Sequence, residues 1–300
     1  ARLTPADVAD ACQAWSEGLG WGQVTALASQ QQHYGSNVAP ADDVLIEARR
    51  WLVDDLAARH PGKRWVVERL AEYHNSYIRA AGWMLMLLLG LRRQASLQIS
   101  ARLGLPGDEA VCIEDKRSSD KPVPSIPLCG HARKQLELVR AHCDAVAARL
   151  ERLSSKSDLH PGLIKAQQQL LAAARGDDVP VLLLFMPCSG GRWRADGLRE
   201  ASSADCIDAL PPQLGLEANL GRHYWQNALR AEGLPTVAID AFVRHTVEGR
   251  ELQASTCAFN LADVHAQLVA AQDRVLARLG LQPIAGLSCR NLAFRTGVDA

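Results

Sequence analysis

The strongest constraint on the fold is a stretch, residues 64–91, that changes from polar to apolar along its length. It begins with charged side chains and ends in the uncharged run GWMLMLLLGL. A helix that is apolar all round must be buried in a core, and this run is about half the length that a membrane span requires. We therefore expect a long helix that ends in the core of a soluble protein, with no membrane partner.

The chain leaves this helix through Gly90, Leu91 and Arg92, so a cation directly follows the most apolar segment. Arginine is not deprotonated in proteins, and its guanidinium offers five N–H donors. A charge placed next to a core must find an anion or water, because burying it alone is costly. Arg92 is therefore a candidate anion-binding residue.

Apolar periodicity and turn signals predict the other elements. Two β-prone runs, residues 109–114 and 123–128, predict a hairpin with basic residues on its loop, and residues 179–186 predict a buried strand followed by a glycine-rich basic loop. Helical spacing of apolar residues predicts further helices at 44–58, 131–153, 163–174 and 261–279. The expected fold class is mainly α with a small β-sheet (α+β).

Residues 219–245 (NLGRHYWQNALRAEGLPTVAIDAFVRH) predict two short helices joined by one turn. Gly233 suits a helix C-terminus and Pro235 suits the first turn of the next helix. Arg222 lies near the start of its helix, where backbone N–H groups and a guanidinium together hold a phosphate or carboxylate. The alternative is that Arg222 and His245 are ordinary polar caps of a helical hairpin.

Charge and cysteine content restrict the partners. Lys plus Arg and Asp plus Glu are 33 each, so there is no overall basic charge, and nucleic-acid binding would depend on local clusters. Eight cysteines without a Cys-x-x-Cys pair favour a reducing cytoplasm. A zinc site is disfavoured because its candidate residues match no established spacing: Cys129, His131, His142 and Cys143. We expect neither a metal nor a cofactor.

The order of these features resembles the catalytic domain of the tyrosine recombinase (phage integrase) family, over residues 78–280. In that family a Gly-Leu-Arg motif carries the first active-site arginine, a hairpin carries a lysine, and His-x-x-Arg and Gly-His motifs follow. In this chain the motifs fall on Arg92, on Lys116 or Lys121, on Asn219 and Arg222, and on Arg244 and His245.

The resemblance implies a DNA-binding protein that takes part in strand exchange or in the integration of a mobile element, cytoplasmic and nucleoid-associated. Two arginines clamp the phosphate, a lysine protonates the departing 5′-oxygen, and His or Asn positions the phosphate. Duplex DNA is the expected partner. Further residues expected to contact the DNA are Arg93, Arg117, Lys121, Arg192, Arg194, His223 and Arg244.

The chain departs from the family pattern at the nucleophile. No Tyr follows Tyr224, and Phe259 occupies the position where the family has its Tyr, after a longer spacer. Phenylalanine has no oxygen, so the family's covalent cleavage cannot start there. Phe259 is either an engineered Tyr→Phe change or a natural divergence. The longer spacer and Asn219 favour natural divergence, because neither would be introduced to disable a nucleophile. The substitute nucleophiles to consider are Ser255, Thr256 and Cys257.

We expect three parts: a helical N-terminal region at 1–76 that is part of a core-binding domain, the recombinase-like domain at 77–280, and a loosely held tail at 281–300. The helix at 261–279 is a candidate for assembly into a homo-oligomer, because that part of active family members packs on a neighbouring protomer. The alternative function is a non-catalytic helical interaction or architectural module that retains a recombinase fold.

Overall fold

The computed structural model describes residues 39–62, 65–93, 97, 99–105, 107–112, 125–154, 161–186, 198–244 and 260–288. Contacts divide the chain into Ala1–Ala39 and Pro40–Ala300, and all described helices and strands lie in the second unit. The predicted domain boundary at residues 76 and 77 lies inside a helix, α4 (Val67–Leu88).

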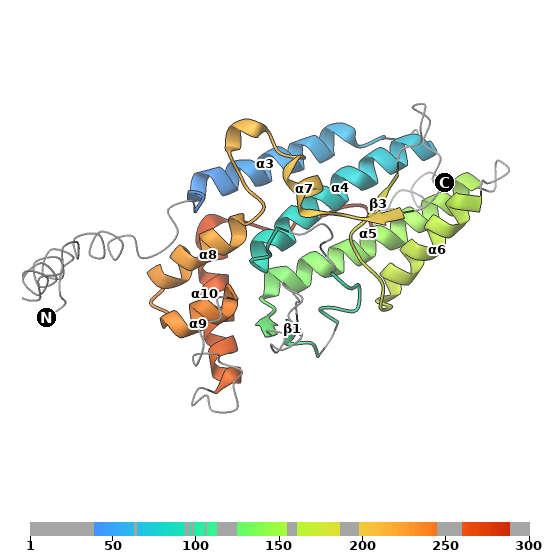
Figure 1. Cartoon of the computed structure of the whole chain (residues 1–300). Helices are drawn as coiled ribbons and strands as arrows, with labels where there is room; N and C mark the ends of the chain where they lie inside the picture. The colour runs from blue at the N-terminus through green and yellow to red at the C-terminus, as the bar shows by residue number, and fades with distance from the viewer. Residues whose placement is uncertain are drawn as a thin grey trace, which may run out of the picture. The chain divides into compact units, whose positions relative to one another are not determined.

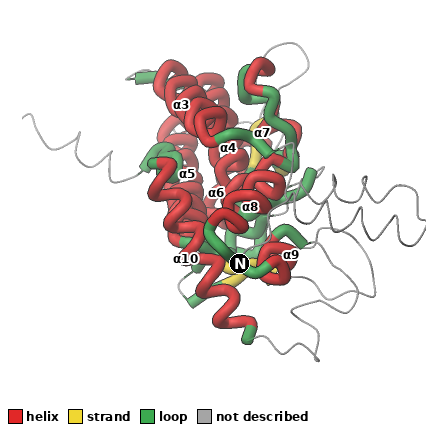
Figure 2. The backbone as a smooth tube through the Cα atoms, turned by 90° about the vertical axis from the view of Figure 1, so that its left-hand side faces the viewer, coloured by secondary structure: helices red, strands yellow, loops and turns green. Residues whose placement is uncertain are grey.

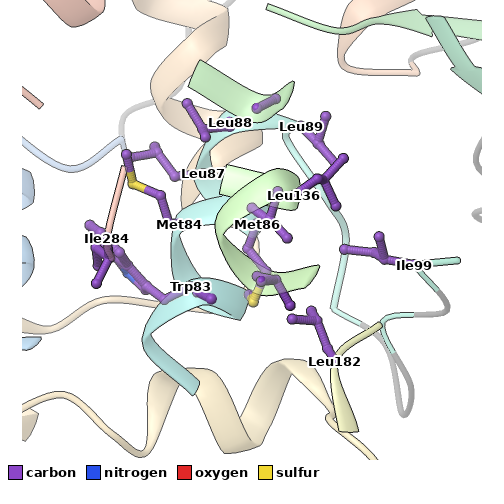
Figure 3. Close-up of a cluster of buried hydrophobic side chains, with 14 of the residues drawn as sticks. Trp83, Met84, Met86, Leu87, Leu88, Leu89, Ile99, Leu136, Leu182 and Ile284 are labelled. Atoms are coloured by element: carbon purple, nitrogen blue, oxygen red, sulfur yellow. The ribbon is translucent and has the colours of Figure 1, made fainter. Parts of the chain in front are cut away.

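The helix α4 is the centre of this unit. It contacts four helices and one strand, and every residue from 80 to 88 is buried, as expected of a helix that is apolar on all sides. Figure 3 shows its end among apolar side chains from other elements, including Leu136, Leu182 and Ile284. The prediction that residues 64–91 end in the core is confirmed.

The remaining helices surround α4. On one side α5 (Gly130–Ser154) packs on α4 and α6 (Pro161–Arg175) packs on α5, while α3 (Asp42–Arg59) also packs on α4 (Figure 1). The other described helices are α7 (Ser203–Ile207), a 3₁₀ turn η1 (Pro212–Leu214), α8 (Leu220–Ala231), α9 (Thr236–Phe242) and α10 (Leu261–Leu279).

Two antiparallel pairs of short strands complete the described fold. The predicted hairpin is present as β1 (Ala110–Cys112) and β2 (Ser125–Pro127), with Val111 opposite Ile126. The predicted buried strand is present only as β3 (Leu183–Phe185), which pairs with an unexpected strand, β4 (Leu198–Glu200). The fold is therefore mainly α with two small sheets in the described residues.

Residues 281–288, at the start of the predicted tail, are held firmly against the core. Both backbone groups of Ile284 pair with the Gln135 amide, at 2.8 Å to its Oε1 and 3.1 Å from its Nε2. Leu281 and Ile284 are each 1% exposed. The expectation of a loose tail is wrong for this segment, because side chains of α4 and α5 satisfy its backbone; residues 289–300 lie outside the described ranges.

None of the helices in the described ranges is long and apolar enough to cross a membrane.

Candidate nucleic-acid interface

The N-terminus of α8 packs directly on the C-terminal end of α4. Gly221 makes this approach possible, since a Cβ built there would lie 2.4 Å from the carbonyl oxygen of Met86 and 2.8 Å from that of Leu87. Trp225, one turn further along α8, donates its Nε1–H to the Leu87 oxygen at 2.7 Å. A small residue followed by an indole donor therefore fixes α8 against α4.

The last carbonyls of α4 and the turn after it accept hydrogen bonds from distant side chains. Gln272 of α10 donates to the Leu88 oxygen at 3.1 Å. The Arg244 guanidinium donates to the oxygens of Leu89 and Gly90. A helix C-terminus carries partial negative charge, so it stabilises the cationic Arg244 side chain, which is only 4% exposed.

Arg92 and Arg222 come together at the turn that follows α9. The Nε of Arg222 donates to the carbonyl oxygen of Val243 at 2.9 Å, and Nη2 of Arg92 donates to that of Arg244 at 3.0 Å. These two carbonyls are consecutive along the chain. Two arginines separated by 130 residues in the sequence therefore hold neighbouring atoms of one turn.

Asn219 ties the residues after α4 to the start of α8. Its Oδ1 accepts a hydrogen bond from the backbone N–H of Arg93 at 2.9 Å. Its own carbonyl accepts from the backbone N–H groups of Arg222 and His223 in the first turn of α8. Asn219 therefore places Arg92 and Arg93 beside the N-terminus of α8 without capping that helix through its side chain.

The local electrostatics favour an anion. Arg92 is half-buried, Arg93 is exposed and Arg222 is 9% exposed, and the helix N-terminus beside them adds partial positive charge. Burial, and then the neighbouring Arg222 charge, lowers the pKa of His223 despite an opposing effect of Glu217. His223 is therefore a neutral group at pH 7, next to guanidiniums that can bind a phosphate.

The elements α8, α9 and α10 lie together (Figure 2), and α8 packs on the C-terminal end of α4 through Gly221 and Trp225. The order of these elements explains why the arginines meet: α4 ends, α8 starts on that end, and α9 returns the chain to it. The predicted residues brought together are Arg92, Arg93, Asn219, Arg222, His223 and Arg244. Those outside the described residues are Lys116, Arg117, Lys121, Arg192, Arg194, His245 and Phe259.

Within the residues that the structure describes, no three His, Cys, Asp or Glu side chains are grouped closely enough to hold a metal ion. Two of the residues weighed for zinc have other surroundings. Burial raises the pKa of the Cys143 thiol to about 12, which keeps it protonated. The His142 ring contacts His74 and the backbone of Leu287.

Two structural features were not predicted from the sequence. The first is the role of Arg244, whose backbone has φ +57, in the left-handed region that glycine adopts most easily. The second is the buried pair of His74 and His142, both 0% exposed. Their positions on the core-facing stripes of two predicted helices were the available signal, since a buried polar side chain needs a partner.

No family model, curated protein or solved structure matches this chain.

Proposed function

We propose that this chain binds duplex DNA through a phosphate site formed by Arg92 and Arg222, as a protein related to the tyrosine recombinases. One observation carries the proposal. Arg92 and Arg222 are the two arginines that the family resemblance selects. They donate to consecutive carbonyls, Arg222 to that of Val243 and Arg92 to that of Arg244. Paired guanidiniums suit the bidentate recognition of phosphate oxygens.

The backbone at Arg244 gives independent support. The resemblance places a glycine at this position, before the family's histidine, and the φ of +57 at Arg244 is a value that glycine adopts without strain. A non-glycine residue pays for this conformation. The turn has thus the conformation of a glycine turn although its residue is arginine.

Arg244 itself fits a positioning role better than direct DNA contact. Its guanidinium is buried against the oxygens of Leu89 and Gly90, while its own carbonyl accepts from Arg92. It therefore joins the end of α4 to the turn that orients both Arg92 and Arg222. Arg93, which is exposed, is better placed for a phosphate contact beyond this pair.

The first test is DNA binding as a function of salt. Each phosphate contact contributes about −0.9 to the slope of log K against log salt. Arg92→Ala is expected to weaken binding about tenfold or more and to flatten this slope by about one unit. Arg92→Lys, which keeps the charge but loses the planar fork, should keep the slope and still bind more weakly.

The control is Arg175→Ala, which removes a charge at the end of α6, where Arg175 pairs with Asp177. Fluorescence anisotropy with a labelled duplex at several salt concentrations measures all four proteins, and thermal unfolding shows that each is folded. If the wild-type chain does not bind duplex DNA, or binds with no dependence on salt, the proposal is wrong.

The second test asks whether DNA is cleaved. Because Phe259 offers no oxygen, we expect no protein-linked strand when the chain is incubated with a nicked suicide duplex and analysed on a denaturing gel. A covalent product would show that another residue attacks, and Ser255→Ala, Thr256→Ala and Cys257→Ala would then identify it. The proposed activity is therefore binding without cleavage.

The alternative of an interaction module has less support from α10. The apolar stripe of this helix is buried inside the same chain, where α10 packs on β2, α8, α5 and α9. The buried members of the stripe are Val264, Leu268, Ala271, Val275, Leu276 and Leu279. A homo-oligomer formed through this helix would have to use its other, more polar face.

A further inference from the structure

The segment that follows α10, residues 281–288, is neither helix nor strand and lies against side chains of α4 and α5. The carbonyl of Ile284, which also contacts Gln135, accepts a hydrogen bond from the Tyr77 hydroxyl at 3.3 Å. Nearer its end, the Leu287 N–H donates to Nδ1 of His142 at 3.0 Å. A Cβ on Gly286 would lie 2.5 Å from that same nitrogen, so the backbone lies directly on the imidazole.

The histidine pair forms a hydrogen-bonded chain whose direction is fixed at both ends. Because Leu287 N–H donates to Nδ1 of His142, the proton of that ring is on Nε2. Nε2 of His142 lies 3.1 Å from Nδ1 of His74, and Nε2 of His74 lies 2.7 Å from the carbonyl oxygen of Leu183. A carbonyl only accepts, so both rings are neutral Nε2–H tautomers.

The hydrogen-bonded chain from Leu287 through the two imidazoles to Leu183 cannot accommodate an additional proton. If the proton goes to Nδ1 of His142, two donors face each other at Leu287. If it goes to Nδ1 of His74, two donors face each other between the rings. Transfer along the rings only moves the conflict back to Leu287, because the Leu183 end is already a satisfied acceptor. Withdrawal of the Leu287 segment is therefore the simplest way to relieve it.

The surroundings also oppose a charged imidazole. Tyr73 and Tyr77 of α4 and Phe185 of β3 pack on the two rings, and Cys143 lies next to His142 in α5. Burial lowers the pKa of His74 to about 4. Burial, His74 and the Arg149 charge lower the pKa of His142 well below its usual value of 6.5.

The sign follows from these shifts. In the closed state residues 281–288 lie against α4 and α5, and in the open state this segment has withdrawn. In the open state the imidazoles regain pKa values near 6.5, so the closed state binds fewer protons than the open state. The closed state is favoured in full above pH 6.5, and its advantage decreases as the pH falls from 6.5 toward 4. For each proton taken up, the open-to-closed ratio rises about tenfold per pH unit in this window.

We propose that His74 and His142 form an acid-sensitive latch, which holds residues 281–288 against α4 and α5 while both imidazoles are neutral and releases this segment when the pair takes up a proton. The latch is independent of DNA binding. The change is local, because the Leu287 end of the hydrogen-bonded chain lies in a segment that is itself neither helix nor strand, whereas His74, His142 and Leu183 lie in helices and a strand.

Hydrogen exchange of the full chain tests the latch. After correction for intrinsic rates, peptides covering residues 281–288 are expected to exchange about fifteenfold faster at pH 5.0 than at pH 6.5 for one proton taken up with an open-state pKa near 6.5. Peptides covering residues 80–88 of α4 should stay protected at both pH values. Equal protection of residues 281–288 at the two pH values, or loss of protection in α4 to the same extent, would refute the latch.

Two variants separate the titration from the contact. In His74→Gln/His142→Asn, amide groups replace the donor to Leu183 and the acceptor for Leu287 without titrating, so the pH effect should vanish. The control is His265→Gln, at a partly exposed histidine of α10 whose pKa is also lowered. This variant should keep the pH effect on the exchange of residues 281–288. A pH effect that persists in the double variant would place the titrating group elsewhere.

Gly286→Ala should open the segment at pH 7.5, because the added methyl meets His142 and Tyr77. Gly130→Ala is the matched control, since a Cβ there meets no heavy atom within 4 Å. The ¹⁵N shifts of the wild-type imidazoles at pH 7.5 decide the matter even if the variants do not fold. An Nδ1–H tautomer in either ring would be incompatible with the latch.

Discussion

Arg244→Leu is expected to lower the free energy of unfolding by about 3 to 5 kcal/mol. The guanidinium of Arg244 donates to the carbonyls of Leu89 and Gly90, and each charge-assisted bond of this kind contributes about 1.5 to 3 kcal/mol. Leucine cannot donate to these carbonyls. Urea denaturation at pH 7 measures the loss. The control Arg175→Leu, at the exposed end of α6, should change the free energy of unfolding by less than about 0.5 kcal/mol.

A second substitution separates the side chain from the backbone. Glycine adopts the φ of +57 at residue 244 without strain, whereas leucine does not. Arg244→Gly is therefore expected to be more stable than Arg244→Leu by about 1 kcal/mol, although both lose the guanidinium. If Arg244→Leu is as stable as the wild type, the contacts of Arg244 with the end of α4 are not what holds this turn.

The same pair of variants bears on the proposed phosphate site. Arg92 and Arg222 are oriented by the carbonyls of the turn that Arg244 joins to α4. If that turn shifts, both arginines lose their fixed positions, and DNA binding should fall in Arg244→Leu even under conditions where the protein is folded. Normal DNA binding by a folded Arg244→Leu protein would show that the turn does not position the arginines.

Local sequence signals were sufficient to predict most of the helices. Asn260 caps α10 through a hydrogen bond from the Ala262 N–H, and Gly280 ends it with φ +63; both residue types are typical of these positions. As a result, the expected range of 261–279 agrees with the structure. The strand β4 was missed because it is only three residues long and contains Arg199, whose side chain pairs with Asp205.

The segment at 281–288 shows why the rest could not be predicted. It has neither helical nor alternating periodicity, and its backbone partners are side chains about 140 to 210 residues earlier in the chain, on Tyr77, Gln135 and His142. Similarly, the order of motifs selected Arg92 and Arg222, but the contact of Arg244 with α4 depends on a positive φ. Neither kind of interaction leaves a local pattern.

The contact between α8 and α4 leads to the second large effect. Gly221→Ala is expected to destabilise the chain by about 3 kcal/mol, at the upper end of the usual cost of overpacking. The added Cβ would lie 2.4 Å from the Met86 oxygen and 2.8 Å from the Leu87 oxygen. Both are backbone atoms of a buried helix, so they cannot turn aside as a flexible side chain does.

Relief of this clash must move α8 away from α4, and two further contacts would change with it. The hydrogen bond from Trp225 to the Leu87 oxygen would lengthen from 2.7 Å, and Arg222, next to Gly221, would shift from the carbonyl of Val243. Gly221→Ala should therefore lose DNA affinity as well as stability, while Gly130→Ala should lose neither. Urea denaturation and anisotropy on the same samples measure both losses. A stable Gly221→Ala protein with normal DNA affinity would mean that α8 does not need its close contact with α4, and that the convergence of Arg92 and Arg222 is not required for binding.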